Sequence, residues 1–247
     1  YPADEISGFC TLCGSYGRFM KDHLMIRESY RCKSCGASAR ERHQAEVILD
    51  RFSKHGSKSI KALVEEPELQ GLRIYELTLR GRFFRYLRKL PNYTHSYYWD
   101  DIAPGEYRDG LQCQDVMSLT YPDDSFDLII SSDVFEHVRH PLVGFQEIAR
   151  VLKPGGIHCW TVPALHPLRQ KTHYRIDTSG SSDIFVDPPR YHIDALGGKS
   201  LVYTEFGRDI CEELRKFGMD TEIISAESDN ENIAKVVTFL SVKHSGR

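Results

Sequence analysis

Four of the seven cysteines fall in two short pairs near the start of the chain, and residues of this kind can bind a metal ion. The pairs are Cys10-x2-Cys13 and Cys32-x2-Cys35. This spacing is typical of a zinc ribbon, in which each pair presents two thiolates on one side of a tight turn, or knuckle. Gly14 and Gly36 follow the pairs, where a knuckle often needs a positive φ. Because four cysteines leave no open position for a substrate, we predict a structural Zn²⁺ site.

Two disulfides, or unrelated buried thiols, are the alternative interpretation of the paired cysteines. The N-terminus lacks a signal-peptide pattern, and chains without one keep their thiols reduced, so zinc is favoured. The segment between the pairs is short and polar, so metal would supply its folding energy. The other cysteines, Cys113, Cys159 and Cys211, lie in no recognisable activating context and are expected to be small core side chains.

The composition excludes several classes of protein. The chain has 247 residues, with 32 Lys and Arg against 35 Asp and Glu, for a net charge of -3. A chain of this length can bury a sizeable core without disulfides. The near-neutral balance argues against a nucleic-acid coat protein or a polybasic membrane anchor. No apolar run approaches the roughly 18 residues of a membrane span, so we expect a soluble, cytoplasmic protein that does not bind membranes.

The elements that must position these residues follow a clear order along the chain. Residues 1–52 are expected to form the zinc ribbon and a connecting helix over 39–52, and 53–70 have the composition of a linker. Strands and helices then alternate. The expected strands cover 73–77, 94–98, 111–115, 126–132 and 157–162, and the expected helices cover 81–90 and 141–152. Such alternation is typical of a parallel sheet covered by helices on both faces.

The alternation stops after residue 164. A polar stretch rich in His, Tyr and Pro runs over 164–200, followed by an expected helix over 204–217 and two closing strands over 221–225 and 236–242. The predicted fold is therefore α/β, with a Rossmann-like, mostly parallel sheet that ends in an antiparallel hairpin. A small zinc-ribbon unit precedes it, and residues 71–247 form the main domain.

Three motifs of the main domain agree in order and spacing with one family of enzymes. They are Asp115–Asp127 (DVMSLTYPDDSFD), Leu128–Val138 (LIISSDVFEHV) and Ile148–Gly156 (IARVLKPGG). Together they resemble the class I S-adenosylmethionine (SAM) dependent methyltransferases, especially the small-molecule type. The resemblance covers residues 71–165 by motif and 200–242 by pattern. It implies a SAM-dependent methyltransferase with this fold.

The resemblance also implies which residues contact SAM, because the ligand of such a sheet lies at the carboxyl ends of the strands. Asp115 would accept the adenine amino group, with Val116 and Met117 against the ring. Asp133 would border both the methionine moiety and the acceptor. Asp100 lies within a few residues of the place where the family has the acid that binds the ribose.

The glycine-rich loop after the first strand departs from the family pattern. The expected acid-x-Gly-x-Gly-x-Gly appears as Glu76-Leu-Thr78-Leu-Arg80-Gly81-Arg82. Glu76 matches the acid, Gly81 alone remains as a glycine, and Thr78 takes a glycine position. Either the loop binds SAM in a modified geometry, with Arg80 or Arg82 near the methionine carboxylate, or the site has been lost. Retained binding is favoured because the other motifs are intact.

Histidines supply the candidates for proton transfer, since methylation of a hydroxyl requires loss of its proton. They are His137, after the fourth strand, and His166, His173 and His192 of the 164–200 segment, which is expected to cover the acceptor pocket. Each could also be an ordinary loop residue. With Asp177 and Asp194 they could instead hold a divalent cation, although no fixed ligand spacing supports this.

The 164–200 segment also suggests the kind of acceptor. It carries basic residues that would favour an anionic or phosphorylated molecule, and tyrosines that could stack on a sugar: Arg169, Lys171, Arg175, Arg190, Tyr174 and Tyr191. We therefore predict O-methylation of a small acceptor. An RNA methyltransferase that docks RNA through the ribbon is the main alternative, but arginines at the spacing seen over 80–89 usually form a solvated face. A third hypothesis is a non-catalytic binding module with the same fold. The oligomeric state stays open.

Overall fold

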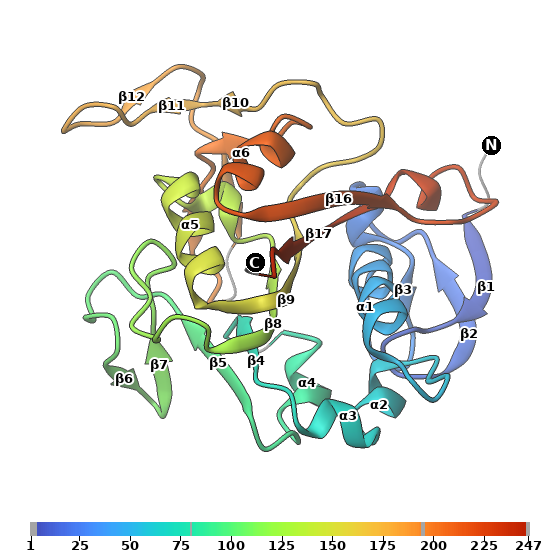
Figure 1. Cartoon of the computed structure of the whole chain (residues 1–247). Helices are drawn as coiled ribbons and strands as arrows, with labels where there is room; N and C mark the ends of the chain where they lie inside the picture. Colours follow the sequence, from blue (N-terminus) through green and yellow to red (C-terminus); the bar gives the residue numbers. More distant parts are fainter. Residues whose placement is uncertain (1–3, 80, 194–195, 246–247) are drawn as a thin grey trace.

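The computed structural model describes residues 4–79, 81–193 and 196–245, and an eight-stranded sheet lies at its centre (Figure 1). The strand order is β16-β17-β9-β8-β4-β5-β7-β6. Their bounds are β4 Ile74–Leu77, β5 Tyr93–Tyr97, β6 Tyr107–Arg108, β7 Leu111–Cys113, β8 Phe126–Ser132, β9 Leu152–Thr161, β16 Met219–Ser225 and β17 Val237–Lys243. The five strands from β9 to β7 are parallel, whereas β17 is antiparallel to both β9 and β16. The predicted parallel sheet with a closing antiparallel hairpin is confirmed.

Helices cover both faces of this sheet. The helix α1 (Ala39–Phe52) packs on one face, and α5 (Pro141–Val151) and α6 (Ile210–Lys216) pack on the other (Figure 1). Strand β8 is apolar on both sides because successive side chains of a strand point to opposite faces of the sheet, and both faces are covered by helices. Leu128 and Ile130 are buried on the α1 side, and Ile129 is buried on the α5 side.

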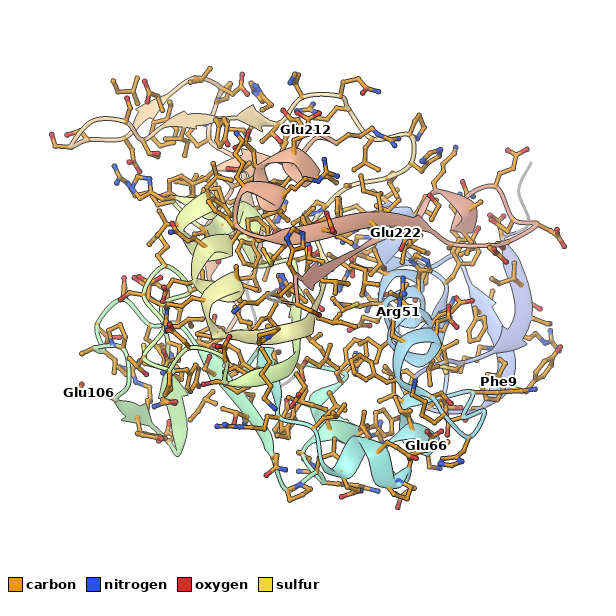
Figure 2. The ribbon with its side chains drawn as sticks, viewed as in Figure 1. Phe9, Arg51, Glu66, Glu106, Glu212 and Glu222 are labelled. Carbon is orange, nitrogen blue, oxygen red and sulfur yellow. The ribbon has the colours of Figure 1, made fainter. Side chains whose placement is uncertain are left out.

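Helix α1 begins and ends at the predicted residues. It starts at a capping box, in which the Ser38 hydroxyl accepts from the Glu41 amide and the Glu41 carboxylate accepts from the Ser38 amide. Gln44 joins the helix to the sheet, since its amide donates to the carbonyls of Ser131 and Cys159, at 3.1 Å each. At the far end, Arg51 pairs with Glu222 of β16 at 3.0 Å (Figure 2). The helix is thus an integral layer over the sheet.

The N-terminal unit is a small antiparallel sheet of β1 (Glu5–Phe9), β2 (Tyr16–Met20) and β3 (Arg31–Cys32), with a short 3-10 helix, η1 (Ile26–Glu28). Its four cysteines belong to the same hydrophobic cluster as α1 and the β8 side chains. Residues 53–70 contain two short helices, α2 (Ile60–Leu63) and α3 (Pro67–Gln70), which add to that cluster. One hydrophobic core therefore contains side chains from both sides of residue 70. The predicted domain boundary near that residue stays a prediction.

Several expected elements differ from the structure. The helix expected over 81–90 is only α4 (Phe84–Leu87), which lies between two short turns. The helix expected over 204–217 is α6 alone, because Thr204 and Glu205 form β15 and pair with β10 (His173–Tyr174). The turn expected at Lys153–Gly156 lies inside β9, which bulges against β8. Pairing with distant strands accounts for the second and third differences.

The segment over 164–200 holds several short strands rather than a single loop. Besides β10 these are β11 (Ile176–Asp177), β12 (Ile184–Phe185), β13 (Tyr191–Ile193) and β14 (Lys199–Leu201). They form two-stranded pairs, with β13 antiparallel to β14 and β11 antiparallel to β12. Within the described residues, no helix combines the length and apolar composition needed to cross a bilayer.

Candidate functional site

The sulfur atoms of the four paired cysteines converge in the N-terminal unit. The Sγ atoms of Cys10 and Cys35 are 3.7 Å apart, as are those of Cys13 and Cys32, and all four lie within 4.8 Å of one another. Zn–S bonds of about 2.3 Å in a tetrahedron place neighbouring sulfurs roughly 3.8 Å apart. The arrangement therefore suits a closed tetrahedral ion and would not accommodate a substrate.

The knuckles have the backbone geometry that the sequence predicts. Gly14 and Gly36 have φ values of +79° and +76°, in the region that favours glycine. Their amides donate to the carbonyls of Cys10 and Cys32, at 2.8 and 2.7 Å. The Arg82 side chain extends to the second knuckle. A Cβ built at Gly36 would lie 3.0 Å from the Nη2 atom of Arg82.

A second polar cluster lies at the carboxyl end of β8. Asp133 has a positive φ of 55°, and Arg27 of η1 donates two hydrogen bonds to its carboxylate, at 2.5 and 2.7 Å. Arg40 of α1 lies 3.5 Å from the same carboxylate. Burial opposes ionisation of Asp133, but these two arginines outweigh it and hold its pKa well below the usual range. Asp133 is thus a fixed negative charge.

Glu28 completes this cluster from the N-terminal unit. The Nε and Nη2 atoms of Arg40 donate to the Glu28 carboxylate at 2.7 and 3.3 Å. The remaining nitrogen, Nη1, is buried and has no hydrogen-bond partner among the described residues. The sequence analysis did not identify Arg27 and Arg40 as site residues, since nothing in their local sequence distinguishes them from surface arginines. The cluster therefore holds a buried cationic donor that is free to bind an anion.

Three of the predicted cofactor residues meet at the end of β4. The carboxylate of Glu76 is buried and accepts a hydrogen bond from the Tyr93 hydroxyl at 2.6 Å. Burial raises the pKa of Glu76 to about 8. A Cβ at Gly81 would lie 2.8 Å from both Glu76 Oε1 and Thr78 Oγ1, so the close approach of the loop requires glycine there. Arg80 lies outside the described residues.

The predicted adenine side is a tight turn after β7. The Oδ1 atom of Asp115 accepts from the Met117 amide at 2.8 Å, and the Ser118 amide donates to the Asp115 carbonyl at 2.9 Å. Val116 is buried against α5. Since Oδ1 is the side-chain oxygen used in this turn, we expect an adenine contact to use the other carboxylate oxygen, Oδ2.

Asp100 lies in the exposed turn that follows β5, next to the same region. Burial, and then the charges of Asp115 and Asp100, raise the pKa of the Tyr98 hydroxyl. Tyr98 is 54% exposed, so this effect of the two acids is felt at the surface. The structure thus brings Asp100 near Asp115, and their roles in cofactor binding stay predictions.

Two of the four candidate histidines meet one another. The Nε2 atom of His137, in the 3-10 helix η2 (Phe135–His137), lies 3.3 Å from Nδ1 of His192 in β13. The Nδ1 atom of His137 lies 2.8 Å from the Leu201 carbonyl. Burial, and then the neighbouring His137, lower the pKa of His192. The strand pair β13-β14 therefore carries a histidine from the 164–200 segment onto the loop after β8.

Glu136 joins this pair, although the sequence analysis did not identify it as a site residue. Its Oε1 atom lies 3.5 Å from His137 Nε2 and 3.8 Å from His192 Nδ1. The side chain is 1% exposed, and neither carboxylate oxygen has a hydrogen-bond partner among the described residues. Burial raises its pKa well above the usual value. The sequence offers one sign of this role, which is that Glu136 directly precedes His137 in the motif Leu128–Val138.

A small cavity of about 10 Å³ lies beside this triad, with room for one water-sized guest. Its walls include Glu136 and His192, together with Arg190 and Glu205. Three arginines of the 164–200 segment converge on the single Glu205 carboxylate, at 2.9 to 3.1 Å: Arg169, Arg175 and Arg190. Three guanidinium groups around one carboxylate leave excess positive charge next to the cavity.

The other two candidate histidines have different neighbours. His173 is hydrogen-bonded to Asp187. His166 donates its amide to the Lys235 carbonyl, near the start of β17. Neither contributes a ligand atom to the group formed by Glu136, His137 and His192. Asp194, a possible ligand of a divalent cation in the sequence analysis, lies outside the described residues.

Comparison with known proteins finds similarity over the middle of the chain. Residues 80–160 match the protein family described as "Methyltransferase domain". A stretch of 57 residues is 35% identical to a 2-methyl-6-phytyl-1,4-hydroquinone methyltransferase of Synechocystis sp.. That stretch makes up 23% of this chain and 18% of the relative, so the chain spans less than a fifth of the length of that protein.

Two solved structures are similar over most of this chain. One is a SAM-dependent methyltransferase from Mesorhizobium loti, 19% identical, covering 74% of this chain and 95% of that one with a TM-score of 0.47. The other is a SAM-dependent methyltransferase from Clostridium acetobutylicum, 15% identical, covering 82% and 98% with a TM-score of 0.47. At these scores the likeness carries no argument about activity.

Proposed function

We propose that this chain, which shares a methyltransferase domain with the matched family over residues 80–160, transfers a methyl group from SAM to a small anionic or sugar-like acceptor. A hydroxyl is the favoured target. The observation that carries the proposal is the gathering of polar side chains at the carboxyl ends of β4, β7 and β8, where ligands of such sheets bind.

The residues present fit the two ends of SAM. The buried Nη1 of Arg40, which lacks a partner among the described residues, suits the methionine carboxylate, since a charge-assisted hydrogen bond would satisfy it. The free oxygen of Asp115 suits the adenine amino group. When bound, SAM supplies an electrophilic methyl group on a sulfonium sulfur.

The 164–200 segment is proposed to bind the acceptor. Arg169, Arg175 and Arg190 provide excess positive charge beside the cavity, which supports an anionic acceptor over a neutral one. His192 lines the same cavity and lies 3.3 Å from His137. Methyl transfer is an in-line displacement, so holding the acceptor and excluding water would supply most of the rate.

The proposed zinc ion is structural. Its four sulfur ligands are buried, and their cluster joins the core that α1 shares with the sheet. Because η1 lies between the two cysteine pairs, the ion would also hold Arg27 in place over Asp133.

A calorimetric titration of the zinc-loaded protein with S-adenosylhomocysteine tests cofactor binding. We expect one binding event per chain. Arg40→Ala should weaken binding by about tenfold or more, since hydrogen bonds to charged groups contribute roughly 1.5–3 kcal/mol. Arg18→Ala, which removes an exposed arginine of β2, is the matched control. Absence of heat with the folded, zinc-loaded protein would contradict the proposed function.

The histidine pair is tested by turnover. With an acceptor taken from a panel of phosphorylated and sugar hydroxyl compounds, His137→Ala and His192→Ala should each lower kcat far more than cofactor affinity. His173→Ala and His166→Ala are the comparisons, because the structure places both outside the pair. Equal losses in kcat and in cofactor affinity would assign His137 and His192 a structural role.

Contacts of the basic 80–89 segment support a small acceptor over RNA. Arg82 lies against the second knuckle, Arg88 lies over the Phe84 ring at 5.6 Å, and Lys89 pairs with Glu65 at 3.8 Å. In the described part of this segment, these three side chains are therefore engaged with protein groups and are not a continuous stripe for phosphates. A salt-dependent mobility shift with generic RNA would favour the RNA methyltransferase hypothesis.

A further inference from the structure

The group formed by Glu136, His137 and His192 has the composition of a metal site. Each residue offers one ligand atom, and these atoms lie within 4.8 Å of one another. The three separations are 3.3, 3.5 and 3.8 Å. Metal bonds of about 2.1 Å at tetrahedral angles place neighbouring ligand atoms roughly 3.4 Å apart. An ion could therefore reach all three with shifts of a few tenths of an ångström.

Glu136 supplies a second, independent observation. Its side chain is 1% exposed, yet both carboxylate oxygens lack hydrogen-bond partners among the described residues. Leaving such a group unpartnered in the interior is costly, and buried carboxylates are normally hydrogen-bonded, ion-paired or bound to metals. Nearby, Asp133 uses Arg27 for this purpose, and no arginine pairs with Glu136 in the described part of the chain.

The orientation of His137 also suits ligation. Its Nδ1 atom lies 2.8 Å from the Leu201 carbonyl, which can only accept, so Nδ1 carries the proton. In the neutral ring, Nε2 then presents its lone pair to Glu136 and His192. Metal-binding histidines typically donate their other ring nitrogen to a carbonyl or carboxylate in this way.

We propose that Glu136, His137 and His192 bind a divalent first-row transition-metal ion, separate from the four cysteines. Two imidazoles and one carboxylate favour such an ion over Mg²⁺ or Ca²⁺, which prefer oxygen ligands. Three protein ligands leave at least one coordination position open, and the adjoining cavity has room for one small ligand. The binding site stands on this cluster alone, and its use during methyl transfer rests on the proposed function.

Another group of potential ligands lacks these features. His55, Glu66 and Glu68 also lie close together, but His55 and Glu68 are exposed. The Glu66 carboxylate already accepts from the Ser53 hydroxyl and from the amides of Lys54 and Ser57. Its oxygens therefore need no ion, and this group provides a control.

Cobalt(II) titration of protein that carries one Zn²⁺ per chain, the amount that the four thiolates bind, tests the proposal, because excess zinc would also fill the group of Glu136, His137 and His192. We expect one Co²⁺ per chain, with weak d–d bands and no sulfur-to-cobalt charge-transfer band, since the site contains no thiolate. His192→Ala should weaken binding at least about tenfold, and Glu136→Gln, checked for folding by circular dichroism, should do the same. His55→Ala and His173→Ala should bind as the parent protein does.

Two outcomes would overturn the metal site. One is the absence of cobalt binding in the folded protein, or binding that appears only as a sulfur charge-transfer band. The other is binding that survives in both His192→Ala and Glu136→Gln. Titration of the same preparation with S-adenosylhomocysteine keeps the two proposals distinct, because failure of cofactor binding with cobalt binding intact contradicts only the proposed function.

Discussion

The two groups of potential metal ligands in this protein are assembled in opposite ways. The four cysteines lie on two short knuckles whose geometry is set by neighbouring glycines, and their sulfurs form a closed set. Glu136 and His137 are adjacent, but His192 comes from a strand 55 positions further along and completes the group only through the fold. The first group can be identified from spacing alone, and the second cannot.

The same contrast separates two acids at neighbouring strand ends. Asp133 is paired with Arg27 from the N-terminal unit, 106 positions away, and stays ionised. Glu76 is more deeply buried than Asp133 and, among the described residues, its carboxylate accepts only from the Tyr93 hydroxyl, so its pKa rises to about 8. The N-terminal unit therefore has a role besides its proposed zinc site, because it supplies the positive charge that pairs with Asp133 at the end of β8.

Removal of zinc should have the largest effect. A chelator, or Cys32→Ser, is expected to unfold the N-terminal unit and lower the free energy of unfolding by about 5 kcal/mol or more. The loss should reach the main domain because the cysteines share a core with α1. Thermal unfolding followed by circular dichroism measures it.

Cys211→Ser is the control for this change, since Cys211 is only partly buried and lies outside the cluster. It should alter stability by about 1 kcal/mol or less. An unchanged transition after complete zinc removal would show that the N-terminal unit folds without the ion, and the contrast between the two ligand groups would fail.

Arg27→Ala should have the next largest effect. Without this guanidinium the partly buried Asp133 carboxylate keeps the more distant Arg40 and the Thr161 hydroxyl, so the loss should approach the value of about 3–5 kcal/mol for a broken buried ion pair. Urea unfolding measures the change. Arg27→Ala combined with Asp133→Asn should recover part of the loss, because the double variant leaves no uncompensated charge.

Arg51→Ala is the matched control, because Arg51 also joins the N-terminal region to the sheet but pairs with Glu222 at the surface (Figure 2). Exposed pairs of this kind contribute about 1 kcal/mol at most. Equal losses in Arg27→Ala and Arg51→Ala would mean that burial does not distinguish the two links.

A third effect is the pH dependence of stability at Glu76. Its folded pKa of about 8 is raised above the ordinary value of 4.5, so the folded state binds one proton more than the unfolded state between these values. This contribution is fully present below about pH 4.5 and is lost as the pH rises through 8. Its slope should reach about 1.4 kcal/mol per pH unit.

Glu76→Gln should remove this slope, since the amide mimics the neutral acid and can still accept from Tyr93. Urea unfolding of both proteins at several pH values between 5 and 9 gives the difference, which cancels the other titrating groups. If the free energy of unfolding changes with pH in the same way in the parent protein and in Glu76→Gln, then Glu76 is ionised in the folded protein and its environment is not apolar.

Much of the fold was predictable from local patterns. Strand β8 and helix α1 have the predicted bounds, because each combines a hydrophobic period with clear end signals, such as the capping box at Ser38. Helix α6 is shorter than expected because Thr204 and Glu205 pair with β10, and such a pairing leaves no local sign. The bulge in β9 was missed for the same reason, because it depends on pairing with β8.

The candidate site divides in the same way. The sequence by itself determined the four cysteines, their knuckle glycines, and the acids at the ends of β4, β7 and β8, since spacing and position in a periodic element are local properties. Only the tertiary structure decided that Arg27 meets Asp133 and that His192 meets His137. Such contacts depend on how distant segments pack to bury apolar surface, and they carry no signal within either segment.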